Sequence, residues 1–239
     1  MPDATPPTAL TIAGSDSGGG AGAQADLKTF AAHRVHGTCA LTAVTAQNTA
    51  EVRGVVALDP DFVRLQIETV LDDFVVVGVK TGMLANRAIV DVVADLAAAG
   101  RLPGLVVDPV LVSSTGQALM APEGLEAYVD RLLPYALVVT PNLREAGTLT
   151  GIDVRELMSV PAMIEAAELI RARGARYVVV KGGHLTDAAH DVVAGPEGVT
   201  VLEAVRVVTG NDHGTGCSLS AAIGTIQLTS GRRSALASA

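Results

Sequence analysis

A glycine loop near the C-terminal end carries the residues best suited to chemistry. Gly214 and Gly216 lead into Cys217, and an apolar, alanine-rich run at helical spacing follows. This pattern predicts a loop that opens onto the N-terminus of a helix, where unpaired backbone N–H groups and the macrodipole attract anions. Glycines also let an anion approach the backbone closely. The stretch therefore fits a phosphate site with Cys217 as nucleophile or base, or a loop whose glycines serve only turn geometry.

Two carboxylates at the ends of predicted strands form a candidate magnesium site. Asp108 closes one strand, and Glu145 follows another. Because Mg²⁺ keeps several waters and takes only one or two carboxylates, the pair fits an indirect or water-mediated site. Asn142 and Glu145 are also spaced like an N-cap and its N3 partner, so a structural role is an equal alternative. Lys181, just before two glycines, is either a phosphate-facing lysine or a solvated strand end.

Gln47 is the candidate for recognising a heterocycle. Its side-chain amide either pairs with the donor and acceptor edge of such a ring or simply closes a strand. We interpret His213 as a loop residue rather than a catalyst, and the remaining histidines show no metal-ligand spacing. Cys39, in the middle of a predicted strand, is interpreted as a core residue.

Buried strands alternate with amphipathic helices along the chain. Strands are predicted at 8–13, 37–45, 52–58, 74–79, 105–108, 136–140 and 177–181, followed by an antiparallel pair at 191–194 and 199–208, and helices at 23–33, after Asp59, after Asn86, and at 122–133, 141–149, 159–173 and after Cys217. Continuous apolar strands between helices indicate an α/β fold with a mostly parallel sheet covered on both faces. Ligands bind beyond the carboxyl ends of such strands, so we expect the candidate residues to gather at that edge.

Composition indicates a globular, cytoplasmic chain. Of the 239 residues, 49% are apolar and 18% are charged, which fits one large α/β domain over 1–239 with a loose, proline-rich tail at 1–7. The net charge of -8 argues against broad nucleic-acid binding, and no apolar run is long enough to cross a membrane. Two cysteines make no disulfide framework, and the N-terminus lacks the regions of a signal peptide, so a reducing cytosol is the simplest setting.

The stretch Ala13–Thr29, with its Gly-Ser-Asp-Ser-Gly-Gly-Gly-Ala-Gly core, resembles the N-terminal signature of the hydroxymethylpyrimidine and phosphomethylpyrimidine kinases of thiamine biosynthesis. These enzymes have the ribokinase-like fold. The similarity continues through 42–49, 80–84, 107–110, 140–146, 180–184 and 213–217, in order and over almost the whole chain. Each motif alone is weak, but the set is highly specific.

The resemblance implies ATP-dependent phosphorylation of 4-amino-5-hydroxymethyl-2-methylpyrimidine and then of its monophosphate, with ATP and Mg²⁺ bound and a homodimer formed. By that likeness the pyrimidine lies against Gln47, Asp26, Met83, Gly14, Ala21 and Val110. Asp108 and Glu145 orient Mg²⁺ and phosphates, Asn142 and Lys181 face the phosphates of ATP, Gly214, Thr215 and Gly216 form an anion hole, and Cys217 is the base. The helix N-terminus is expected to lower the pKa of Cys217.

The chain departs from the family pattern at two places. Ser114 stands where many members carry a lysine, and members usually continue with another helix beyond the point where this chain stops. A pyridoxal kinase of the same fold and a non-catalytic pyrimidine-binding protein are the alternative functions. A dinucleotide-binding oxidoreductase is disfavoured, because the first glycine loop lacks a clean G-x-G-x-x-G and no acidic residue ends the second strand.

Overall fold

The computed structural model describes residues 6–111, 120–183, 189–205 and 213–230, with only the backbone given for 226–230. Several predicted features lie outside these residues. They are most of the N-terminal tail, Ser114, the end of the strand predicted at 199–208, the first part of the glycine loop before His213, and the C-terminal segment after Ser230. Among the described residues, no helix is long and apolar enough to span a membrane.

A single nine-stranded sheet organises the described chain, in the order β3-β2-β1-β4-β5-β6-β7-β8-β9. Its strands are β1 (Thr8–Ser15), β2 (His36–Gln47), β3 (Val52–Ala57), β4 (Val76–Thr81), β5 (Val106–Val107), β6 (Val138–Val139), β7 (Tyr177–Lys181), β8 (Ala189–Gly195) and β9 (Gly198–Ala204). The six strands from β2 to β7 run parallel, whereas β3, β8 and β9 pair antiparallel at the two ends. This topology confirms the α/β fold with a small antiparallel element.

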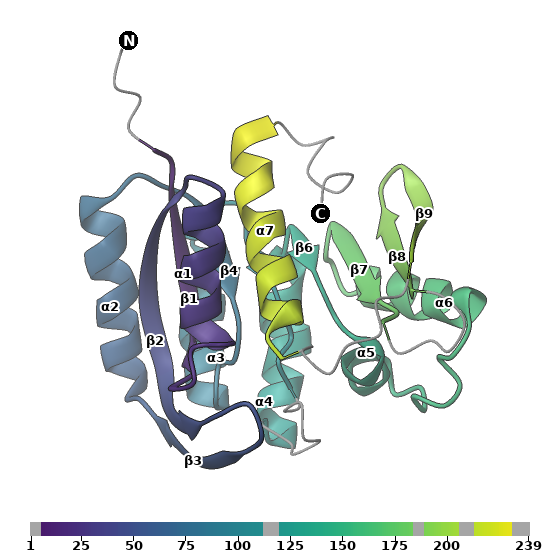
Figure 1. Cartoon of the computed structure of the whole chain (residues 1–239), viewed down its shortest axis with the longest axis horizontal. Helices are drawn as coiled ribbons and strands as arrows, with labels where there is room; N and C mark the ends of the chain where they lie inside the picture. Colours follow the sequence, from purple (N-terminus) through teal and green to yellow (C-terminus); the bar gives the residue numbers. More distant parts are fainter. Residues whose placement is uncertain (1–5, 112–119, 184–188, 206–212, 231–239) are drawn as a thin grey trace.

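Helices cover both faces of the sheet (Figure 1). They are α1 (Gly22–Ala32), α2 (Pro60–Asp73), α3 (Arg87–Ala98), α4 (Pro122–Ala127), α5 (Leu143–Thr150), α6 (Val160–Arg171) and α7 (Thr215–Ser230). The main apolar core contains residues of α2 to α6, and two smaller clusters lie beneath α1 and α7. Continuous burial of the central strands explains their uninterrupted apolar sequences.

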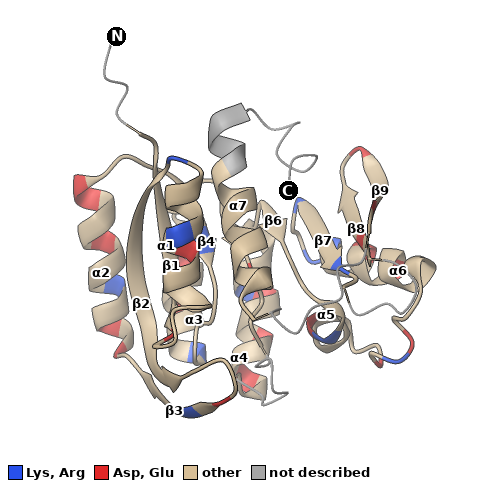
Figure 2. Ribbon diagram, viewed as in Figure 1, with Lys and Arg blue, Asp and Glu red and all other residues tan. Residues whose placement is uncertain are grey.

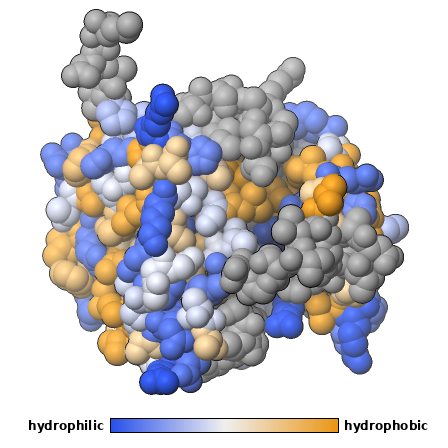
Figure 3. Space-filling model, in the orientation of Figure 1, coloured by the Kyte–Doolittle hydropathy of each residue, from blue (hydrophilic) through white to orange (hydrophobic). Residues whose placement is uncertain are grey.

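Local capping chemistry sets where the helices begin. Asp59 accepts hydrogen bonds from the backbone of Asp61 and Phe62, and Asn86 accepts one from Ile89. These side chains pair N–H groups that have no partner within the helix, as the sequence predicts. Charged residues occur along α2 (Figure 2). Figure 3 shows hydrophilic and hydrophobic residues intermixed over the face that carries α1 and α7.

Three elements are markedly shorter or less regular than predicted. The helix predicted over 122–133 is α-helical only to Ala127, continues as a π-helical turn over Tyr128–Leu132 and ends in a 3-10 turn at Leu133–Tyr135. Pro134 in that last turn lacks the N–H that an α-helix requires. The strands predicted at 105–108 and 136–140 shorten to two residues each, although Leu105 and Asp108 still make backbone hydrogen bonds to neighbouring strands.

A buried ion pair joins α1 to the middle of the sheet. The Lys80 ammonium lies 3.0 and 2.9 Å from the two carboxylate oxygens of Asp26, and Thr11 donates a further hydrogen bond of 2.6 Å to Asp26. Lys80 is 1% exposed and Asp26 is 0% exposed. A buried charge needs such a partner, because removing one member leaves the other without compensation. The pair therefore fixes α1 against β1 and β4, the strands that lead into the cavity described next.

Candidate active site

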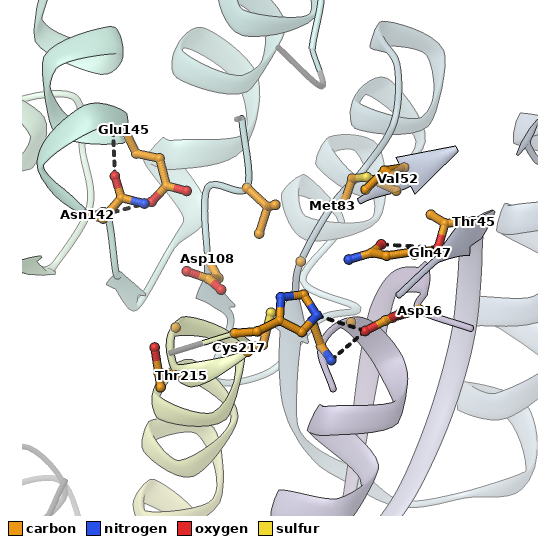
Figure 4. A pocket seen from close by; sticks show the side chains of 18 of the residues that line it. Asp16, Thr45, Gln47, Val52, Met83, Asp108, Asn142, Glu145, Thr215 and Cys217 are labelled. Carbon is orange, nitrogen blue, oxygen red and sulfur yellow. Dashed lines mark hydrogen bonds and ion pairs between the residues drawn. The ribbon is translucent and has the colours of Figure 1, made fainter. Parts of the chain in front are cut away.

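A cavity of about 460 Å³ lies beyond the carboxyl ends of the parallel strands. Its described lining comprises Gly14, Ser15, Asp16, Ala21, Gly22, Thr45, Gln47, Val52, Val55, Gly82, Met83, Asp108, Val110, Asn142, Arg144, Glu145, Lys181, Gly183, His213, Gly214, Thr215, Gly216 and Cys217. Figure 4 shows side chains from both halves of the sheet converging on it. The strand-end motifs of the sequence therefore meet in one place, as their positions predict.

One end of the cavity combines apolar side chains with the side-chain amide of Gln47. Gln47 points into the cavity, and its side-chain oxygen accepts a hydrogen bond of 3.2 Å from Thr45 (Figure 4). A Cβ on Gly14 would lie 2.5 Å from the terminal methyl of Met83, so only glycine leaves that methyl in place. Val52 and Val55 of β3 also line this end. Their periodicity predicts a strand but does not indicate that they line a binding site.

Asp26 does not belong to this end of the cavity, which corrects the prediction drawn from the resemblance. The residue is fully buried and is absent from the described lining. Both carboxylate oxygens are bound by Lys80, and one also accepts from Thr11. The predicted pyrimidine contact is thus replaced by a structural ion pair beneath the cavity.

Asp16, which the sequence did not single out, organises the first glycine loop. Its carboxylate accepts backbone hydrogen bonds from Gly18, Gly20 and Ala21, at 2.8, 3.1 and 2.8 Å. It also lies 3.1 Å from the imidazole Nε2 of His213. Burial opposes ionisation of Asp16, but the hydrogen bonds from His213 and from the three amides lower its pKa overall. An aspartate followed by glycines is a turn signal, whereas its contact with His213 is not visible in sequence.

The two glycine loops touch backbone to backbone at the other end of the cavity. Gly214 has a φ of +83°, and a Cβ there would lie 1.8 Å from the carbonyl oxygen of Gly20. Only glycine allows this conformation and this approach. Helix α7 begins directly afterwards at Thr215, and a Cβ on Gly216 would lie 3.1 Å from the Lys181 ammonium. The helix N-terminus and a cation thus face the same space, which favours an anion.

Asp108 lies at the centre of this end. One carboxylate oxygen accepts from Thr140 at 2.9 Å and from Lys181 at 3.2 Å, and the other accepts from Ser220 at 3.2 Å. Although burial disfavours its charged form, the carboxylates of Asp108 and Glu145 raise the pKa of Lys181 overall. The lysine is therefore a cation that the site itself maintains.

Glu145 caps α5, as its spacing from Asn142 predicts, and it also lines the cavity. It forms a capping box with Asn142, whose backbone N–H donates to the Glu145 carboxylate at 2.8 Å and whose side chain accepts from Glu145 N–H at 2.9 Å. It also lines the cavity and is 4% exposed. Burial raises the pKa of Glu145 to about 8, with Lys181 opposing the shift and Asp108 adding to it.

Cys217 lies in the first turn of α7, between the two ends of the cavity (Figure 4). Burial raises the pKa of Cys217 to about 11, and the positive charge of Lys80 only partly opposes this. The expectation that the helix N-terminus would lower this pKa is therefore wrong. Desolvation of the thiolate outweighs the favourable backbone and Lys80 contributions.

The raised pKa of Glu145 predicts that its ionisation weakens folding. The carboxyl group has a pKa of 4.5 as a reference for the unfolded chain and about 8 in the fold. Its contribution to stability is thus complete below pH 4.5 and is lost as the pH rises to about 8. Glu145→Gln keeps a capping acceptor but cannot ionise.

We therefore expect the urea-unfolding free energy of the wild type to fall relative to that of Glu145→Gln over this pH range, by at least about 1.4 kcal/mol, the equivalent of one pKa unit. A difference between the two proteins that does not change with pH would contradict the assignment.

Comparison with known proteins shows the same relationship along the sequence and in three dimensions. The profile of a family described as phosphomethylpyrimidine kinase matches residues 16–237. A hydroxymethylpyrimidine/phosphomethylpyrimidine kinase of Streptomyces coelicolor is 47% identical over 222 residues, which are 93% of this chain and 81% of the relative.

Two solved structures resemble the whole fold. The phosphomethylpyrimidine kinase of Clostridium difficile 630 superimposes with a TM-score of 0.82 at 38% identity, covering 95% of this chain and 93% of that one. The ADP complex of Bacillus subtilis pyridoxal kinase superimposes with a TM-score of 0.88 at 40% identity, covering 98% and 88%. These neighbours share the ribokinase-like fold. Because the family profile spans nearly the whole chain and the relative from Streptomyces coelicolor agrees with it, this chain belongs to the phosphomethylpyrimidine kinase family.

Proposed function

We propose that this kinase transfers the γ-phosphoryl group of ATP to the hydroxymethyl group of 4-amino-5-hydroxymethyl-2-methylpyrimidine and then to the resulting monophosphate. The observation that carries the proposal is that one cavity joins a heterocycle-sized end at Gln47 to an anion-binding end at Gly214–Cys217. Phosphoryl transfer requires positioning and charge neutralisation above all, and this arrangement can supply both.

The pyrimidine lies in this proposal at the Gln47 end. The Gln47 amide, whose oxygen is oriented by Thr45, faces the amino and ring-nitrogen edge of the heterocycle. The ring packs beside Met83, with Gly14, Ala21 and Val110 completing the pocket. This arrangement directs the hydroxymethyl group toward Cys217 and the anion hole.

The phosphates of ATP lie at the opposite end. Backbone N–H groups of Gly214, Thr215 and Gly216 form the anion hole at the start of α7. Lys181 and Asn142 face the phosphates from β7 and the start of α5. Together these groups would neutralise the charge that develops as the γ-phosphoryl group leaves ADP.

Mg²⁺ is part of the proposal, and Asp108 and Glu145 would hold it, partly through water. The two carboxylates line one cavity, and the charge of Asp108 contributes to the raised pKa of Glu145, so a cation between them relieves their repulsion. Within the described residues no group of three or more metal-ligating side chains occurs, so water and phosphate oxygens complete the coordination that Mg²⁺ prefers. When bound, the ion supplies charge neutralisation at the phosphates.

Cys217 accepts the proton of the substrate hydroxyl in the first transfer. The oxygen–phosphorus bond to the substrate forms as the bond between the γ-phosphorus and ADP breaks, and the hydroxyl proton moves to the thiolate form of Cys217, which becomes the thiol. The second transfer starts from a phosphate monoester, whose second pKa of about 6 leaves its oxygens ionised at neutral pH. A base is therefore needed for the alcohol but not for the monophosphate.

Replacement of Cys217 consequently affects the two transfers unequally. We expect Cys217→Ala to lower kcat for the pyrimidine alcohol by about 10²-fold or more and kcat for the monophosphate by less than about tenfold. ATP affinity, measured by calorimetry, stays within about twofold because the thiol is not among the groups proposed to hold phosphate.

Cys39→Ala is the matched control, since it removes the second free, half-buried thiol from a position in β2 outside the described cavity lining. Equal losses for both substrates, or an unchanged kcat with the alcohol, would show that Cys217 is not the base.

The function itself is tested by ADP release with the pyrimidine alcohol, its monophosphate and pyridoxal side by side. We expect turnover with the first two substrates to exceed turnover with pyridoxal. Turnover with pyridoxal and not with the monophosphate would instead support the pyridoxal kinase, an alternative favoured by similarity to the Bacillus subtilis enzyme. Binding of the pyrimidine without ADP release would support a non-catalytic protein.

A homodimer in the cytoplasm completes the proposal. Strand β3 is an edge strand, and its Val55 and Val56 are exposed, as is Val44 of the adjacent β2. An exposed edge with apolar side chains favours pairing with a second copy. Sedimentation velocity would show this as twice the monomer mass.

A further inference from the structure

His213 and Asp16 form a contact that the roles above leave unused. The His213 Nε2 atom lies 3.1 Å from an Asp16 carboxylate oxygen, although 197 positions separate the two residues. The same carboxylate oxygen, Oδ2, also accepts hydrogen bonds from the backbone N–H groups of Gly20 and Ala21. Asp16 is 3% exposed, so donors from the protein rather than water stabilise its negative charge. The imidazole is therefore fixed in position from one side.

The orientation of the imidazole ring follows from its neighbours. A Cβ on Gly20 would lie 2.8 Å from Cδ2 and 3.4 Å from Nε2 of His213, so this edge of the ring faces the first glycine loop. The Nδ1 atom lies across the ring from Cδ2 and has no hydrogen-bond partner among the described residues. His213 is also one of the residues that line the cavity.

The second phosphoryl transfer has a charge requirement that the first lacks. Its substrate brings a phosphate group into a cavity that already contains the carboxylates of Asp16, Asp108 and Glu145. Lys181 is paired with Asp108, and Arg144 belongs to α5 beside the capping box. Among the described lining residues, His213 is the basic side chain that borders the first glycine loop and directly precedes Gly214.

We propose that His213 is a specificity-determining residue that binds the phosphate of the monophosphate substrate. This inference rests on the proposed function. Asp16 accepts a hydrogen bond from Nε2–H and orients the ring, and in the complex Nδ1–H donates to a phosphate oxygen. The alcohol substrate carries no phosphate and makes no such contact. His213 thus favours the second transfer without participating in the chemistry of the first.

His213→Gln tests this role, because a glutamine amide can still donate to Asp16 but carries no charge. We expect the KM for the monophosphate to rise about tenfold or more, as the loss of a charge-assisted hydrogen bond predicts. The KM for the alcohol stays within about threefold. Calorimetric titration of the variant with the monophosphate alone gives the same weakening in Kd, independently of turnover. His213→Asn gives the same comparison if the glutamine variant does not fold.

Equal losses for the alcohol and the monophosphate would overturn the inference and leave His213 as a support for the glycine loops. Asp16→Asn is the reference for such a structural effect. It disturbs the first glycine loop, so we expect it to lower turnover of both substrates. If the wild type phosphorylates neither compound, the proposed function fails instead. The two failures are therefore distinguishable in one set of assays.

Discussion

The buried carboxylate of Asp108 is the constraint on which the rest of the site depends. It lies at the end of a two-residue strand and is bound by Thr140 after β6, Lys181 at the end of β7 and Ser220 on α7. A carboxylate that is 2% exposed is costly unless such donors surround it. Each donor comes from a different element, so satisfying one charge sets the positions of β5, β6, β7 and α7 together.

A second constraint joins the heterocycle end of the cavity to the phosphate end. The backbone of Gly214 approaches the Gly20 carbonyl so closely that no side chain fits between them. Asp16 holds the same two loops through the Gly20 amide and through His213. The loop after β1 and the loop before α7 therefore behave as one unit. In the proposed reaction, this contact would set the separation between the nucleophile of one substrate and the phosphates of the other.

Sequence alone could predict the elements and the edge at which the site forms, because these depend on short-range patterns. Strand periodicity, caps such as Asn142 and the glycine loop before Cys217 are all read over a few residues. It could not predict pairings made between distant positions. Asp26 lies 54 positions from Lys80, and Asp16 lies 197 from His213. The ion pair with Lys80 takes Asp26 away from its predicted contact with the pyrimidine. The contact with Asp16 gives His213, which the sequence indicates only as a loop residue, a defined partner.

The pKa of Cys217 also depends on residues that are distant in the sequence. A helix N-terminus favours a thiolate, but burial beside Asp108 and Asp26 opposes it more strongly. At neutral pH most Cys217 side chains are therefore thiols, and the base in the proposed reaction is the minor thiolate form, which the charge of Lys80 favours. The chemistry of the site thus depends on the same buried charges that hold its elements together.

Phosphorus NMR of the complete reaction tests most directly whether one cavity carries out both phosphoryl transfers in sequence. With excess ATP and the pyrimidine alcohol, we expect a phosphate monoester signal to appear first and then to be replaced by diphosphate signals. Two molecules of ATP are consumed for each molecule of pyrimidine. Accumulation of the monoester as the final product, or release of inorganic phosphate without any organic phosphate, would contradict this expectation.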